Sequence, residues 1–106
     1  MDVQLRAICD PTRLEILKAL SRRELRTGEI ASAFPVSRPA ISHHLRVLSE
    51  AGLVRVRRQA QSRLYSIDAA AVRELRSRFN RFWDDALARL KAAAEAEPRA
   101  RRRRSR

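Results

Sequence analysis

The sequence predicts a mainly α-helical fold with one small β-hairpin. Two observations support this fold class. Over most of the chain, apolar residues recur every three or four positions, as on the buried side of an amphipathic helix. Between residues 53 and 67 the apolar residues are instead grouped in two short runs rich in β-branched and aromatic types, on either side of a polar stretch. A chain of 106 residues has the size of one domain, too small to hide a large catalytic cleft.

Three short helices are expected in the first third of the chain. The first covers residues 2–9. Its apolar residues are Val3, Leu5 and Ile8. Asp10 is expected to cap the second helix, about residues 11–21, because Pro11 follows it directly. The residues of this helix expected to face a core are Leu14, Leu17, Ala19 and Leu20. Thr27 is expected to cap a third helix, which ends at Ala33.

Residues 37–51 are predicted to form a helix that is buried on one side and polar on the other. Ser37 can accept from the free N–H groups of the first turn, and Gly52 ends the helix. The apolar side consists of Ile41, Leu45 and Leu48. The opposite side carries Pro39, Ser42, His43 and Arg46. Such polar groups can reach phosphates and base edges in a major groove, and the preceding helix and tight turn complete a helix-turn-helix.

The segment after Gly52 is predicted to be a hairpin, or wing, with a basic tip. Its apolar residues are Leu53, Val54, Val56, Leu64, Tyr65 and Ile67. Arg57, Arg58 and Arg63 are expected to touch the DNA backbone or minor groove, although strand charges can also serve only to keep an edge from pairing. The tip, residues 59–62, contains neither Gly nor Asn, so a tight two-residue turn is not indicated and the turn type stays open.

A long helix from about Ala69 to Ala96, capped by Asp68, is expected to follow the hairpin. Its apolar residues form a stripe of about seven turns, which is larger than soluble monomers usually expose. A second copy of the chain is the simplest partner for this stripe. Alternatively the stripe folds back against the first two helices, and part of it is expected to do so. A homodimer is therefore predicted, with the interface residues Val3, Leu5, Ile8, Phe79, Phe82, Trp83, Leu87 and Leu90.

Positive charge is concentrated in two segments, and the formal net charge is +12. Residues 37–63 contain six arginines against Glu50 alone, a local net charge of +5. This excess predicts a surface that faces a polyanion, and the alternative is a solvated charged face without a partner. Residues 99–106 hold six arginines and no acid. We therefore expect a disordered tail, 97–106, after a DNA-binding and dimerisation domain, 1–96.

Cys9 is the only cysteine, so an intramolecular disulfide is excluded and a reducing compartment is indicated. We expect it to be a small buried residue rather than a redox sensor. No apolar stretch has the length of a signal-peptide core or of a membrane span, so a cytoplasmic protein, associated with the nucleoid through DNA, is expected. The chain also lacks a Gly-rich phosphate loop and a nucleophile at a telling distance from a base, so an enzyme is not expected.

These residues resemble the arsenical-resistance-repressor (ArsR) family of bacterial winged-helix regulators over roughly residues 3–92. The resemblance rests on Asp10-Pro11-Thr12-Arg13 opening a helix, on Phe34-Pro35-Val36-Ser37-Arg38-Pro39-Ala40-Ile41-Ser42-His43-His44-Leu45-Arg46-Val47-Leu48 as turn and reader, and on Ala51-Gly52-Leu53-Val54 and Leu64-Tyr65 in the wing. It implies a winged helix-turn-helix homodimer that places two recognition helices in successive major grooves of an inverted-repeat operator. Repression by blocking polymerase, often at the regulator's own promoter, is the usual mode of the family.

The chain departs from the metal-sensing members of that family. Such sensors carry cysteine ligands in the helix before the reader, or His and acidic ligands on the last helix. Here the first stretch, residues 27–32, has neither Cys nor His, and the second, 69–96, has no His. His43 and His44 are adjacent and cannot form the i, i+4 ligand pair of a helical metal site. The chain therefore resembles the metal-independent members, no metal or cofactor is expected, and the sequence does not indicate which signal it answers to.

The predicted DNA-binding residues are Ser37, Arg38, Pro39, Ser42, His43, His44, Arg46, Arg57, Arg58 and Arg63. Arg46 is expected to contact a base or phosphate, whereas contact and no contact are equally open for His43. His44 lies closer to the buried side, which favours packing and phosphate anchoring over base reading. The competing hypothesis is a sequence-nonspecific nucleoid or RNA-associated protein. Such a protein does not need a capped helix that fits the groove, and a preferred operator sequence would discriminate.

Overall fold

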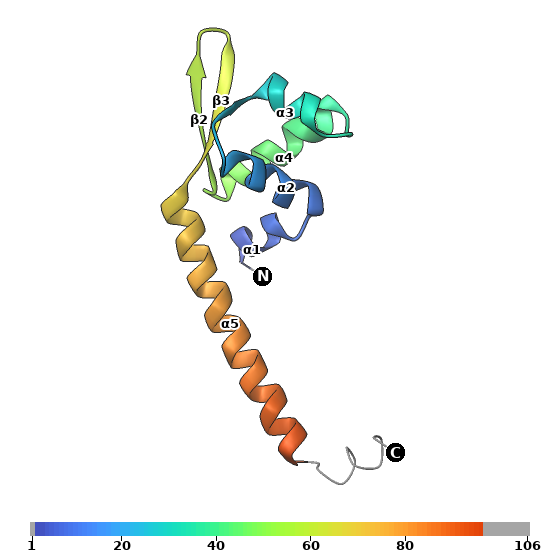
Figure 1. The fold of residues 1–106 in the computed structure, drawn as a ribbon, viewed down its shortest axis with the longest axis vertical. Helices are drawn as coiled ribbons and strands as arrows, with labels where there is room; N and C mark the ends of the chain where they lie inside the picture. Colours follow the sequence, from blue (N-terminus) through green and yellow to red (C-terminus); the bar gives the residue numbers. More distant parts are fainter. Residues whose placement is uncertain (1, 97–106) are drawn as a thin grey trace. The chain divides into compact units, whose positions relative to one another are not determined.

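The computed structural model describes residues 2–96. In that range the elements are α1 (Val3–Ile8), α2 (Pro11–Leu20), β1 (Leu25–Arg26), α3 (Thr27–Ala33), α4 (Arg38–Glu50), β2 (Val54–Gln59), β3 (Ser62–Ile67) and α5 (Ala69–Ala96) (Figure 1). The predicted fold class, mainly α with a small hairpin, is confirmed. By its internal contacts the chain divides into a unit that ends at Leu75 and a unit that begins at Arg76. The predicted tail, 97–106, lies outside the described residues.

Three helices begin at the caps that the sequence predicted. Asp10, Ser37 and Asp68 accept hydrogen bonds from main-chain N–H groups of their own first turns at 2.8, 3.2 and 3.0 Å. These side chains satisfy donors that a helix start leaves without partners, so they fix where α2, α4 and α5 begin. The N–H groups that bond to the Asp10 carboxylate, that of Arg13 first, lower its pKa, and the N–H of Ala71 does the same for Asp68.

The start of α3 was predicted wrongly. Thr27 is the first residue of the helix rather than its cap. The Glu29 carboxylate instead reaches back and accepts from the N–H of Arg26 at 2.9 Å. This bond, and a second from the Arg23 guanidinium at 3.2 Å, lower the pKa of Glu29. The carboxylate at the third helical position thus satisfies the main-chain N–H of the cap residue, which is one half of a capping box.

Gly52 ends α4 as predicted. Its φ of +76° lies in the left-handed region that glycine adopts without steric strain. The N–H of Leu53 donates to the carbonyl of Leu48 at 3.1 Å, and that of Gly52 donates to Ser49 at 3.0 Å. These two bonds form a Schellman motif, which turns the chain directly from α4 into β2.

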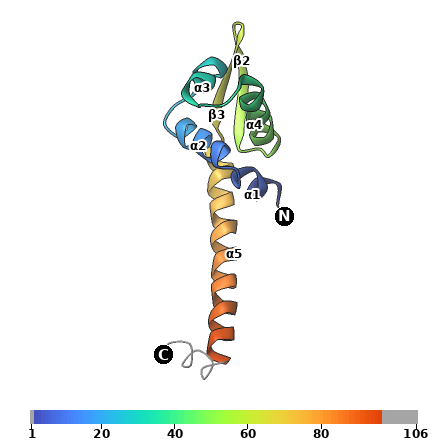
Figure 2. The same ribbon diagram turned by 90° about the vertical axis from the view of Figure 1, so that its right-hand side faces the viewer.

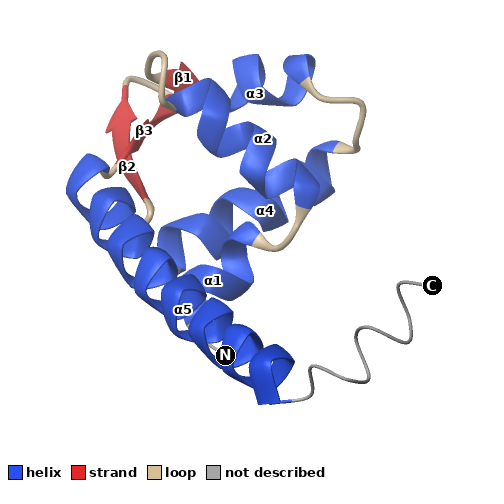
Figure 3. Cartoon of the chain, turned by 60° about the horizontal axis from the view of Figure 1, so that its bottom comes forward, coloured by secondary structure: helices blue, strands red, loops and turns tan. Residues whose placement is uncertain are grey.

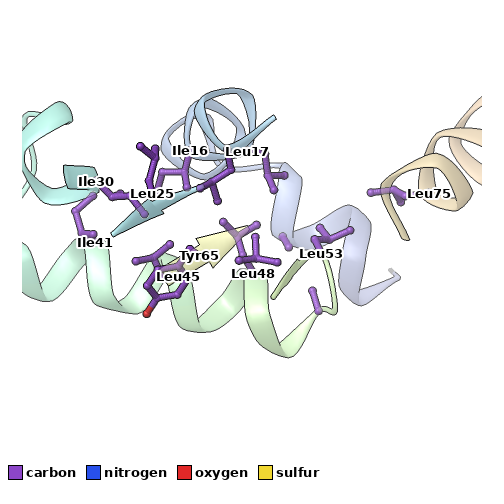
Figure 4. Packing of buried hydrophobic residues seen from close by; sticks show 14 residues of the cluster. Ile16, Leu17, Leu25, Ile30, Ile41, Leu45, Leu48, Leu53, Tyr65 and Leu75 are labelled. Carbon is purple, nitrogen blue, oxygen red and sulfur yellow. The ribbon is translucent and has the colours of Figure 1, made fainter. Parts of the chain in front are cut away.

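The apolar side of α4 lies at the centre of the core, as predicted: Ile41, Leu45 and Leu48 are almost fully buried (Figure 4). The other buried apolar residues of the core are Ala7, Ile16, Leu17, Leu20, Leu25, Ile30, Ala51, Leu53, Val54, Tyr65 and Leu75. The prediction for α2 was wrong at Leu14, which is 39% exposed, whereas Ile16 is completely buried. The buried residues of α2 occupy one side of the helix, and Leu14 lies well off its centre at 100° per residue.

α1 is held against the core by both apolar and polar contacts. Ala7 is buried, and Leu5 and Ile8 pack partly against the core. The amide Nε2 of Gln4 donates to the carbonyl of Ala51, at the end of α4, at 2.9 Å. Cys9 was expected to be buried, but it is exposed because α1 ends at Ile8 and leaves Cys9 in the turn toward α2.

The sheet has three antiparallel strands in the order β1-β3-β2. Figure 3 shows these strands, in red, beside helices α2, α3 and α4. The strand β1, which pairs Leu25 with Tyr65, was not predicted from the sequence. The turn left open by the sequence is the tight two-residue loop, because Gln59 pairs with Ser62. Its first residue, Ala60, has a φ of +56°. The hairpin projects beyond α3 and α4 (Figure 2).

α5 changes character along its length. Leu75 is buried, and Ala71 and Val72 pack partly against the core, so part of the apolar stripe is core as expected. The large apolar residues after Arg76 that are exposed are Phe79, Phe82, Trp83, Leu87 and Leu90. The rings of Phe79 and Trp83 meet edge to face with centroids 6.1 Å apart. None of the helices among residues 2–96 is long and apolar enough to cross a membrane.

Candidate nucleic-acid interface

A groove of about 770 Å³ lies between α4, the start of α3 and the wing. Its lining residues are Arg26, Thr27, Gly28, Arg38, Ser42, Leu45, Arg46, Ser49, Val56, Gln61, Ser62, Arg63 and Tyr65. Four of these are arginines, and none is acidic. A concave surface with four guanidinium groups and no carboxylate in its lining favours a negatively charged ligand.

The outward side of α4 supplies one wall of this groove. Ser42 and Arg46 lie one helical turn apart, and both are exposed. Arg38, in the first turn of α4, lies close to α3: a Cβ atom at Gly28 would be 3.9 Å from its Nη2 atom. Of the other predicted DNA-binding residues of this segment, Ser37, Pro39 and His43 are also exposed but do not line the groove.

The wing supplies the opposite wall. The pairing register of its strands decides which of the predicted arginines lie on the face toward the groove. Arg58 lies directly opposite Arg63, on the sheet face that carries Val56 and Tyr65. Arg63, Val56 and Tyr65 all line the groove. Like charges directly opposite in a sheet repel each other, so an anion bound between Arg58 and Arg63 would stabilise the pair.

Arg57 lies on the other face of the hairpin, opposite Leu64. Its Nη2 atom donates to the carboxylate of Glu24 at 3.4 Å. Arg55, two residues earlier, donates to Asp68 at 3.3 Å. Hence the structure does not bring the three predicted wing arginines together, and the charge of Arg57 is partly compensated within the chain.

α3 and β1 bring three residues to the groove that were not predicted from the sequence, namely Arg26, Thr27 and Gly28. The short strand β1 fixes Arg26 beside β3, where it pairs with Leu64. Two residues of strand carry no periodicity, so the pattern could not place them. The remaining signal was their position at the start of α3, the helix that precedes the reader helix, α4. In a helix-turn-helix this preceding helix crosses the DNA backbone.

His44 lies on a different side of α4 from the groove and is half-buried. Its Nδ1 atom is 3.3 Å from the Nη1 atom of Arg13 in α2. Arg13 also donates from Nε to the carbonyl of Ala7 at 2.6 Å and from Nη2 to the carbonyl of Arg6 at 3.4 Å. One guanidinium therefore contacts the last turn of α1 and the reader helix together.

Metal-ligand types do not cluster in the described part of the chain. Between residues 2 and 96, no group of three or more His, Cys, Asp and Glu side chains could hold a metal ion. The polar groups that line the groove are guanidinium, hydroxyl, amide and main-chain groups, which bind anions and base edges.

A capped helix, buried on one side and bordered on the other by a basic groove and a two-stranded wing, defines the winged helix-turn-helix class of DNA-binding domains. A profile described as bacterial regulatory protein, arsR family, matches residues 10–56. The HTH-type transcriptional regulator Rv2034 of Mycobacterium tuberculosis is 43% identical over 81 residues, which cover 76% of each chain. The chain belongs to the ArsR family of bacterial transcriptional regulators.

Further relatives agree with this assignment. The transcriptional repressor SdpR of Bacillus subtilis is 36% identical over 74 residues, which span 70% of this chain and 82% of that protein. The crystal structure of a possible transcriptional regulator for arsenical resistance superimposes with a TM-score of 0.75 at 44% identity, covering 89% of this chain and 97% of the other. The predictions of a sequence-specific DNA-binding transcriptional regulator, and of a protein that is not an enzyme, are confirmed by this membership.

Proposed function

We propose that the protein is a repressor that binds an inverted-repeat operator as a homodimer and occludes the promoter from polymerase. The observation that carries this proposal is the groove between α4 and the wing, lined by four arginines and by no acid. With a reader helix in the major groove and a wing at the neighbouring minor groove, the phosphates of the strand between them would lie in such a groove.

The residues divide by role. Ser42, His43 and Arg46 are exposed and lie midway along α4, so we assign them to base edges. Arg26, Arg38 and Arg63 line the groove at its edges and are assigned to phosphates.

The other predicted residues are assigned weaker roles. Arg58 supports phosphate binding beside Arg63, its neighbour across the strands on the groove face of the wing. Arg57 contributes least to DNA binding because Glu24 pairs with it. Ser37 and Pro39 fix the start of the reader.

Dimerisation is assigned to the first and last helices. The apolar side of α5 beyond Arg76 is exposed, with Phe82 at 60% and Leu90 at 62%. Val3 of α1 is 63% exposed as well, whereas Leu5 and Ile8 are half-buried. A second copy would cover the exposed side chains and would place two reader helices for two half-sites, which a single chain could not bind together.

Repression is supported by the name of a relative, SdpR, which is a transcriptional repressor. We further propose that the protein acts in the cytoplasm and without a bound metal. Titrating zinc, nickel, cobalt, cadmium or arsenite against a fluorescent operator should leave the affinity unchanged, and a tight stoichiometric effect of any one ion would contradict the metal-independent assignment.

An unbiased selection of binding sites from random double-stranded DNA tests the proposal. The full chain should enrich an inverted repeat whose half-sites lie about one helical turn apart, about 10 base pairs, or a multiple of it. Enrichment of a single half-site would contradict the dimer. No preference for any sequence would instead support a nonspecific nucleic-acid-binding protein.

A further inference from the structure

The guanidinium of Arg13 joins three helices. It belongs to α2, it donates to two carbonyls in the last turn of α1, and its Nη1 atom lies 3.3 Å from Nδ1 of His44 on the reader helix. Both carbonyls lie at the end of α1, where the helix itself supplies few donors, and that of Arg6 also accepts from the N–H of Cys9 at 3.3 Å. This leaves the third branch of the guanidinium for the imidazole.

The chemistry of the pair fixes the proton of the imidazole. Arginine has only donors and stays charged, so in this contact Nδ1 of His44 must accept. A neutral imidazole that accepts at Nδ1 carries its proton on Nε2. The two ring nitrogens point in diverging directions, so this N–H is directed away from Arg13.

We propose that Arg13 is a positioning residue that holds His44 with its proton on Nε2, so that the reader helix offers a hydrogen-bond donor to a phosphate oxygen of the operator. His44 lies two residues after Ser42 and two before Arg46. At 100° per residue it is rotated about 200° around α4 from Ser42. Because Ser42 and Arg46 line the groove and His44 does not, its contact falls on the other flank of the reader.

A phosphate suits this flank better than a base. His44 is half-buried on the side of α4 next to Leu45 and Leu48, whereas His43 and Arg46 are exposed on the side that faces away from these buried residues. In major-groove readers, groups at the helix flanks reach the backbone and groups at the middle reach base edges. The proposal rests on the proposed function, since it needs α4 to lie in the major groove.

The tautomer can be measured without DNA. In ¹⁵N NMR spectra at about pH 8.5, where imidazole is neutral in water, His44 should be entirely the Nε2–H form. The neighbouring His43, which is exposed, should be a mixture of both forms and serves as an internal control. Arg13→Met should turn His44 into a mixture as well. Arg13→Lys should do the same, because Arg13 reaches Ala7 and His44 through two separate nitrogens and lysine has only one. A mixture or an Nδ1–H form of His44 in the unmodified chain would overturn the proposal.

Measuring the affinity for the selected operator shows whether Arg13 acts by positioning His44 or only by capping α1. His44→Ala should weaken binding about 5- to 10-fold, as expected for the loss of one hydrogen bond. The slope of log affinity against log salt should stay the same, since a neutral ring displaces no counterion, whereas the matched control Arg63→Ala should reduce it by about 0.9. Arg13→Met should weaken binding in the normal background but add little in the His44→Ala background.

An equal loss from Arg13→Met in both backgrounds would show that Arg13 acts only by capping α1, and would overturn the proposal. Failure of the proposed function looks different. In that case neither the variants nor the unmodified chain would prefer any operator. The tautomer of His44 would still be fixed in the free protein.

Discussion

Helices α4 and α5 are both amphipathic, but only α4 has its whole apolar side covered by its own chain. In α4, Ile41, Leu45 and Leu48 are at most 1% exposed. In α5 beyond Arg76, Phe82 and Leu90 are about three-fifths exposed. The same helical pattern therefore serves two purposes. α4 is anchored by its apolar side and exposes its polar side, which we propose binds DNA, whereas α5 beyond Arg76 exposes apolar residues that we propose bind a second copy.

The largest effect is expected from a charge on the apolar side of α5. Leu87→Glu or Trp83→Glu should convert the dimer to monomers, measured by analytical ultracentrifugation, because a buried unpaired carboxylate opposes association. Operator affinity should fall about 100-fold or more, since the two half-sites would no longer be bound together. Ser77→Glu, on the polar side of the same helix, adds the same charge and should leave the dimer intact. A folded dimer with Leu87→Glu would place the interface elsewhere.

The next effect concerns the polar side of α4. Arg46→Ala should weaken binding to the selected operator by about 1–3 kcal/mol, and binding to random DNA much less. Arg57→Ala removes the same charge from the far face of the wing, where Glu24 already pairs with it. Its effect should stay within about 0.5 kcal/mol. Equal losses from Arg46→Ala on both kinds of DNA, measured by fluorescence anisotropy, would show that Arg46 touches only phosphate.

The ends of several helices and the buried side of α4 could be predicted from the sequence, because their signals lie within a few residues of one another. Asp10, Ser37 and Gly52 mark helix ends within a few residues, and the spacing of Ile41, Leu45 and Leu48 shows which side of α4 is buried. In α2 the pattern was less decisive, because Leu14 and Ile16 are both apolar and only the packing selects Ile16.

The division of the wing arginines could not be predicted for a different reason. Whether Arg57 or Arg58 shares a face with Arg63 depends on the pairing register, and a shift by one residue exchanges the two faces. The register follows from the two-residue loop, which forms at Ala60 without the glycine or asparagine that usually signals it. The strand β1 was missed because two residues are too few to show alternation.

A smaller effect is expected from acid. The pKa values of Asp10 and Asp68 are lowered in the folded chain by their helix N–H groups, and that of Glu29 is lowered by the N–H of Arg26. A carboxylate with a lowered folded pKa adds stability above its ordinary pKa, near 4, and that contribution is lost as pH falls through the folded value. The melting temperature should therefore decrease when the pH is lowered below about 4.

Asp10→Asn provides the control, because asparagine caps a helix as well as aspartate but does not titrate. This variant should melt near the normal temperature at pH 7, and its melting temperature should fall less steeply in acid. An unchanged slope in calorimetry between pH 5 and pH 2.5 would mean that the cap at Asp10 is not a source of the acid sensitivity.

The smallest effect is expected at the tip of the wing. Ala60 has a φ of +56°, where a side chain is disfavoured and glycine is not. Ala60→Gly should raise the free energy of unfolding by about 0.5–1 kcal/mol, measured by urea denaturation. Ala88→Gly, on the polar side of α5, should lower it by about 0.5–1 kcal/mol. A loss of stability from Ala60→Gly would show that the tip is not strained.

The central claim is that α4 and the wing bind DNA while the apolar side of α5 binds a second copy of the chain. Hydroxyl-radical footprinting of side chains, read by mass spectrometry with and without the selected operator, tests both halves in one measurement. Phe82, Trp83 and Leu87 should react slowly in the free protein and equally slowly with DNA, because the partner copy covers them in both states. His43, Arg46 and Arg63 should react rapidly in the free protein and slowly only with the operator. Rapid reaction of Trp83 in the free protein, or no protection of Arg46 by DNA, would contradict the account.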